Sequence, residues 1–141
     1  MNDPMTVLEA IHVNAEMGRE TIFHLRRKAQ GSFATMLRTQ QAGYDSILAR
    51  SGEMLRAMGA TPKRPAWMLR MMADMGMDLR TLRDSSTPKL AQLLIHGASM
   101  GVTDMKKALR LHPGAQQDVL ALGEELIQME QQQMRQWVEK L

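Results

Sequence analysis

Cysteine is absent from this 141-residue sequence, and aromatic residues make up only 4% of it. Without cysteine the chain forms no disulfide, thiolate nucleophile, iron–sulfur cluster or cysteine-based zinc site. The sequence also lacks an apolar run of about 18 residues, the length that a membrane-spanning helix requires. The first residues include acids and no basic stretch before an apolar core, unlike a secretory signal. We therefore expect a single soluble domain in the cytoplasm.

The charge is small and unevenly distributed. The formal net charge is +3, but residues 63–110 carry nine bases and four acids, whereas residues 111–141 carry two bases and five acids. Nucleic-acid-binding surfaces usually combine clustered bases with aromatic residues for stacking. Here the bases alternate with acids and aromatic residues are scarce, so nucleic-acid binding is not expected.

Proline and glycine divide the sequence into five segments with helical periodicity. Asp3 before Pro4 is a typical N-cap for the first segment. No stretch has the alternating pattern of a strand, so an all-α fold is predicted. Two hairpins with short turns, joined by a long connection, predict an up-down four-helix bundle with one crossover. The expected helices cover residues 4–29, 32–58, 66–82, 87–110 and 115–140.

Two parts of the sequence carry a resemblance to a known fold. The stretches MGRETIFHLRRKAQGSFATMLRTQQAGYDSI and AQLLIHGASMGV…LGEELIQMEQQQMRQWVEKL resemble uncharacterised bacterial proteins with a ferritin-like bundle. The resemblance covers nearly the whole chain and implies the fold, but it carries over no activity. Di-iron members of this fold place a Glu from each of two helices and a Glu-x-x-His from each of the other two around the metals.

The inward-facing positions do not carry that di-iron ligand set. Of the four carboxylates and two histidines in that set, helical phase places only the carboxylate of Glu130 at an expected ligand position. We therefore expect no di-iron centre, no cofactor and no enzymatic activity. The residues that phase places on the inner faces instead are Gly18, Gln40, Gly43, Gly97, Gly101 and Gln133. The Gly97-x-x-x-Gly101 spacing predicts a close approach of two bundle helices.

A buried polar layer is expected where the metal-binding relatives hold their ions. It consists of Gln40, Tyr44, Glu130 and Gln133. A buried carboxyl group without a cation is costly unless it is protonated or hydrogen-bonded, so the pKa of Glu130 should be raised. Tyr44 and the two amides are the expected hydrogen-bond donors.

A second group of polar residues has the spacing of a surface metal site. Glu9 and His12 form a Glu-x-x-His motif, and Glu16 follows one turn later. Three such side chains on one helix could hold a divalent metal ion. They lie on the polar face or at its boundary, where solvated side chains are the commoner explanation, so this site is only a weak candidate.

Methionine is unusually abundant, with 15 residues. Trp67, Met68, Met71, Met72 and Met75 form an apolar stripe on the predicted crossover helix. The spacing is similar to Met-x-x-Met copper arrays, but packing or a protein interface is favoured because methionine suits adaptable apolar contacts. If exposed, this stripe would bind a partner or an acyl chain.

These observations lead to one main hypothesis and one alternative. The chain is expected to be a non-catalytic ferritin-like bundle that acts through protein association, as a homodimer formed through the crossover or the following helix. The alternative is a metal-binding or storage protein for iron, manganese or copper, using the surface Glu/His residues or the methionine stripe.

Overall fold

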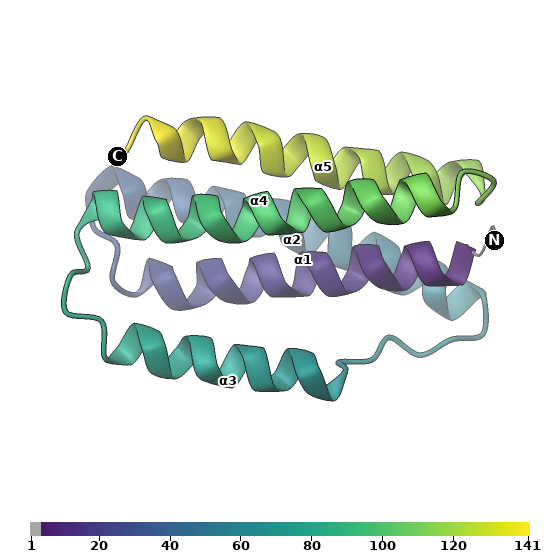
Figure 1. Ribbon diagram of the computed structural model, residues 1–141, viewed down its shortest axis with the longest axis horizontal. Coiled ribbons are helices and arrows are strands. Elements are labelled where there is room, and N and C mark those ends of the chain that lie inside the picture. The colour runs from purple at the N-terminus through teal and green to yellow at the C-terminus, as the bar shows by residue number, and fades with distance from the viewer. Residues whose placement is uncertain (1–3) are drawn as a thin grey trace.

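The computed structural model describes residues 4–141 and consists of five helices, with no strand in that range (Figure 1). The all-α prediction is confirmed, and each helix end lies within three residues of its expected position. Asp3, the predicted N-cap, lies outside the described residues. None of the described helices has both the length and the apolar character needed to cross a bilayer. The helices are α1 (Pro4–Arg26), α2 (Gly31–Ala57), α3 (Ala66–Arg80), α4 (Thr87–Leu111) and α5 (Gln117–Val138).

Helix α1 is the central element of the molecule. It packs most extensively against α2 and also contacts α3, α4 and α5, while α4 and α5 form the second close pair. Figure 1 shows α1, α2, α4 and α5 lying alongside one another, with α3 set apart beside α1. The chain between α2 and α4 runs back along the molecule through α3, so α2 and α4 point in the same direction.

Local signals explain where α2 stops. Gly59 adopts a φ of 79°, in the left-handed region that favours glycine. The Gly59 N–H donates to Arg56 O and the Ala60 N–H donates to Leu55 O, both at 2.9 Å. These two bonds form the Schellman arrangement that satisfies the last carbonyl groups of a helix. The chain then leaves α2 toward Pro62 and Pro65, which cannot continue it.

An ion pair attaches the α2–α3 loop to α1. The Arg64 guanidinium pairs with the Glu16 carboxylate and lies 3.7 Å from Glu20 Oε1. Glu16, expected on the solvated face, is therefore buried at 8% exposure. The prediction of its environment was wrong because helical phase alone did not show that this loop covers α1.

Helix α3 packs on α1 through one side of its methionine stripe. Met68 and Met72 are buried, at 1% and 9% exposure, so in this chain they take the packing alternative. Met75 is half-buried, and its sulfur accepts a hydrogen bond from Thr21 Oγ1 at 3.3 Å. Trp67 and Met71 remain exposed, each at 46%. The stripe is thus divided between contact with α1 and an outer surface.

A glycine allows α1 and α2 to approach closely. A Cβ atom on Gly18 would lie 2.4 Å from Cε1 of the Tyr44 ring. Tyr44 is itself 1% exposed, so the ring has little room to move. Gly18 therefore makes the space that the Tyr44 ring occupies between the helices.

The predicted close approach at Gly97 is not observed. A Cβ on Gly97 would meet no atom within 4 Å, whereas one on Gly101 would lie 3.0 Å from Asn14 Oδ1 and 3.2 Å from Glu130 Oε2. Of these two glycines, Gly101 is the one that lies close to side chains of α1 and α5. The Gly-x-x-x-Gly spacing was misleading because helix α4 borders open space at Gly97.

We predict opposite effects for alanine at two of these glycines. Gly18→Ala should lower the free energy of unfolding by about 1–2 kcal/mol, because overpacking against Tyr44 outweighs the gain in helix propensity. Gly97→Ala is the matched control and should raise it by about 0.5–1 kcal/mol. Urea denaturation measures both values. A similar stabilisation by the two substitutions would contradict the packing described for Gly18.

Candidate functional site

A cavity of about 520 Å³ lies between α1, α3 and α4. Helices α3 and α4 both pack on α1, and the cavity occupies the space between them. Most of its lining side chains are apolar, and Tyr44, Glu130 and Trp137 reach it from α2 and α5. Its apolar side chains include Val13, Met17, Ile22, Trp67, Met71, Leu94, Met100 and Met105.

The outer walls of the cavity carry large exposed apolar side chains. Trp67 and Met71 on α3 are each 46% exposed, and Met100 on α4 is 53% exposed. Gly97 also lines the cavity, and because it has no side chain, helix α4 does not obstruct the opening at that position. The cavity is therefore accessible from solvent and apolar at its entrance.

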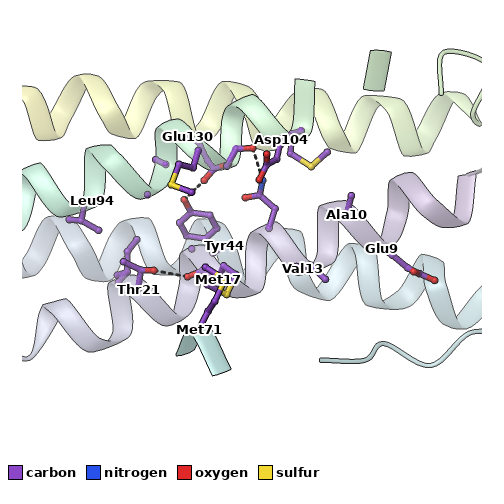
Figure 2. Close-up of a pocket in the computed structure, with 18 of the residues that line it drawn as sticks. Glu9, Ala10, Val13, Met17, Thr21, Tyr44, Met71, Leu94, Asp104 and Glu130 are labelled. Atoms are coloured by element: carbon purple, nitrogen blue, oxygen red, sulfur yellow. Dashed lines mark hydrogen bonds between the residues drawn. The ribbon is translucent and has the colours of Figure 1, made fainter. Parts of the chain in front are cut away.

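A buried phenol–carboxyl pair lies against the cavity. The Tyr44 hydroxyl donates a hydrogen bond of 2.8 Å to Glu130 Oε2. Figure 2 shows the two side chains directed toward one another between the helices. Glu130 is 2% exposed, and its other oxygen, Oε1, has no hydrogen-bond partner. Among the described residues, Tyr44 is thus the one hydrogen-bond donor to this carboxyl group.

The surroundings change the acidity of both groups. Burial raises the pKa of Glu130 to about 7, and the hydrogen bond from Tyr44 opposes this shift. Burial and the neighbouring Glu130 carboxylate raise the pKa of the Tyr44 hydroxyl well above its usual value. Tyr44 therefore stays a donor, while Glu130 changes its charge near neutral pH.

Asn14 joins α1 to α4 beside this pair. Its Nδ2 donates to Gly101 O at 2.8 Å, and both residues line the cavity. Sequence reasoning missed Asn14, although it lies one turn before Gly18 on the inner side of α1. The only sequence signal for this contact was an uncharged polar residue at the edge of an apolar stripe. That pattern is too common to identify a contact.

The structure buries all four residues of the expected polar layer, but their partners differ from those anticipated. Gln40 accepts a hydrogen bond from Trp137 Nε1 and donates one to Gln136 Oε1, both at 2.8 Å. Gln133 is 5% exposed and its Oε1 has no partner. Of the expected donors to Glu130, only Tyr44 is observed in that role.

The weak metal candidates on α1 point to different neighbours. Glu9 is exposed at the cavity, while Glu16 pairs with Arg64. His12 Nδ1 is 2.7 Å from Ser51 Oγ, and burial lowers the pKa of its imidazole. Within residues 4–141, no three side chains of the metal-binding types are close enough to hold an ion. The Glu9, His12 and Glu16 spacing therefore does not produce a ligand cluster.

The interior also does not fit the di-iron ligand set of the ferritin-like fold. The buried carboxylates of the described chain are those of Glu16 and Glu130, and the first is neutralised by Arg64. None of the four histidines is buried. Two iron ions need several anionic oxygens and imidazoles, which these residues do not supply.

Comparison of the chain with protein-family models, curated proteins and solved structures gave no match. The interpretation of the cavity therefore depends on its own residues.

The raised pKa of Glu130 predicts a pH-dependent stability. The unfolded chain releases this proton near pH 4.5 and the folded chain near pH 7. The contribution of Glu130 to stability is therefore complete below pH 4.5 and is lost as pH rises to about 7. The loss attributable to this group is on the order of 3 kcal/mol. Above that range the contribution is constant.

Glu130→Gln removes this titration while keeping an oxygen that accepts from Tyr44. The variant should lose the decline between pH 5 and 8 and be more stable than the wild type at pH 8. Urea denaturation at a series of pH values measures the difference. Parallel pH profiles for the two proteins would show that Glu130 does not titrate as described.

Proposed function

We propose that this chain is a non-catalytic binding protein that holds a small apolar molecule in the cavity between α1, α3 and α4. The observation that carries the proposal is the combination of about 520 Å³ of open space with apolar walls and one buried, partly unpaired carboxyl group. Ligand cavities are commonly about 300–1,000 Å³, mainly apolar, and equipped with a few placed polar groups. The cavity has all three properties.

The same proposal includes a ferritin-like arrangement of α1, α2, α4 and α5, with α3 as part of the crossover. The two close helix pairs and the parallel direction of α2 and α4 support it. In this arrangement, Glu130 and Tyr44 occupy the part of the interior where metal-binding proteins of the ferritin-like fold hold their ions. We propose that this chain uses that part of the interior to bind an organic molecule and not a metal ion.

The two tryptophans allow binding to be measured directly. Both Trp67 and Trp137 line the cavity, and the chain contains no other tryptophan. Intrinsic fluorescence should therefore change when 1-octanol, a neutral apolar probe, enters the cavity. Isothermal titration calorimetry of the same mixture gives an independent dissociation constant.

A side chain added at Gly97 should block the cavity without disturbing the core, because a Cβ there meets open space. We expect Gly97→Leu to weaken 1-octanol binding by at least about tenfold, the loss of about 1.4 kcal/mol of binding free energy. Ser99→Leu is the matched control, since Ser99 is exposed on the same helix and does not line the cavity. Equal loss in both variants, or no binding to the wild type, would contradict the proposal.

A second candidate function is association of two copies of this chain through the outer side of α3. Leu69 and Met77 on this helix are 48% and 65% exposed, and neither lines the cavity. Large apolar side chains on both sides of a 15-residue helix exceed what packing on α1 requires. The uncovered side is thus suited to the same helix of a second copy.

Light scattering tests this association. We expect the wild type to be dimeric at micromolar concentration and the Leu69→Ser/Met77→Ser double variant to be monomeric, with 1-octanol binding retained. A monomeric wild type would contradict the association proposal and leave ligand binding unaffected.

A further inference from the structure

We propose that the ligand of this cavity is an apolar amine, whose ammonium group pairs with Glu130 and whose hydrocarbon part contacts the α1, α3 and α4 walls. This inference rests on the proposed ligand-binding function and specifies the chemical class of the ligand.

The charges around the cavity all have the same sign. Three ionisable acids line it, Glu9, Asp104 and Glu130, and no Lys, Arg or His does so. This is unexpected in a chain whose formal net charge is +3. A cation entering the cavity meets attraction at each of these acids, whereas a carboxylate ligand meets repulsion.

Glu130 supplies a specific contact within this acidic environment. Its Oε1 is buried and has no hydrogen-bond partner, while Oε2 accepts from Tyr44. A buried acceptor without a donor is costly, and the cost is greater when the group is ionised. A ligand that brings a donor to Oε1 removes this cost, so the carboxyl group favours a ligand with an N–H or O–H head.

Most of the hydrogen-bond donors beside Glu130 are already used within the protein. Asn14 Nδ2 donates to Gly101 O, Tyr44 donates to Glu130 Oε2, and Trp137 Nε1 donates to Gln40 Oε1. These three residues line the cavity. The Tyr44 O–H and the Trp137 N–H are not available to a ligand acceptor, while the Asn14 amide keeps one of its two hydrogens. When Glu130 is ionised, the inner side of the cavity therefore offers a negatively charged acceptor and few donors, which favours an amine over a carboxylic acid.

The remaining lining fits the apolar part of such a ligand. Met17, Met71 and Leu94 lie around the Tyr44–Glu130 pair in the cavity wall (Figure 2). Methionine side chains are flexible and polarisable, so they adapt to hydrocarbon chains of different shape. The walls thus supply affinity, and Glu130 supplies the preference for the head group.

Ligand charge and Glu130 protonation should be coupled. The other charged groups that line the cavity are Glu9 from α1 and Asp104 from α4, both exposed, and α2 contributes the neutral Tyr44. A bound ammonium group would favour the ionised carboxylate, since the pKa of Glu130 is about 7 in the free protein. Amine binding should therefore strengthen between pH 6 and pH 8.

Three probes with the same eight-carbon chain test the inference at pH 8: 1-octylamine, 1-octanol and octanoate. Calorimetry should show 1-octylamine binding at least about tenfold more tightly than 1-octanol, the effect of about 1.4 kcal/mol from one charged hydrogen bond. Octanoate should bind most weakly. The alcohol serves as the reference because it has the same chain and no charge.

Two variants assign the preference to one carboxyl group. Glu130→Gln should reduce 1-octylamine affinity to that of 1-octanol measured in the same variant. Glu124→Gln is the matched control, because it removes the same charge from an exposed position on α5 outside the cavity and should keep the amine preference.

The possible results separate the two proposals. An amine preference that disappears in Glu130→Gln and persists in Glu124→Gln supports the inference. Equal binding of all three probes, or an amine preference that persists in Glu130→Gln, overturns the inference and leaves the ligand-binding function standing. Absence of binding by every probe overturns both.

Discussion

The hydrogen bond between Tyr44 and Glu130 is the contact on which the interior of this protein depends. It joins α2 to α5 across the molecule at 2.8 Å. The Tyr44 ring reaches Glu130 only because Gly18 on α1 has no side chain in its path. Glu130 in turn lies beside Gly101, the position at which α4 comes close to α1. Residues of four helices therefore meet at one buried polar contact.

The position of α3 determines that this contact faces a cavity. Arg64 attaches the preceding loop to Glu16, and Met68 and Met72 attach the helix itself to α1. Helix α3 thus packs along α1 without closing against α4, as Figure 1 shows. The opening remains because Gly97 adds no side chain at that point on α4. The buried carboxyl group is therefore adjacent to accessible space.

The sequence was sufficient to predict the helices and the burial of Gln40, Tyr44, Glu130 and Gln133. Both depend on periodicity and on local signals such as Gly59, which are properties of neighbouring residues. Helical phase could not reveal contacts made by distant segments. Glu16 is on a polar face by phase but is covered by the α2–α3 loop. The environment of a surface residue depends on what crosses it, which periodicity does not encode.

The cavity was beyond sequence reasoning for a related reason. The methionine stripe was a visible signal, but the sequence does not show which of its residues are buried. Met68 is buried where α3 packs on α1, whereas Met71 is exposed and lines the cavity. Gly97 and Gly101 have the same spacing signal but different surroundings, one facing open space and the other Asn14. Small residues indicate only that room is needed, and the backbone arrangement decides whether a neighbour or a cavity uses it.

The most direct test of this account is the titration of Glu130 in the folded protein. In a sample with ¹³C-labelled glutamate carboxyl groups, the Glu130 resonance is identified by its absence from the Glu130→Gln spectrum. We expect it to titrate with a pKa of about 7, because burial opposes the charged form. Saturating 1-octylamine should lower that pKa. A Glu130 resonance that titrates near the ordinary value of 4.5 would contradict the buried, unpaired carboxyl group at the centre of the account.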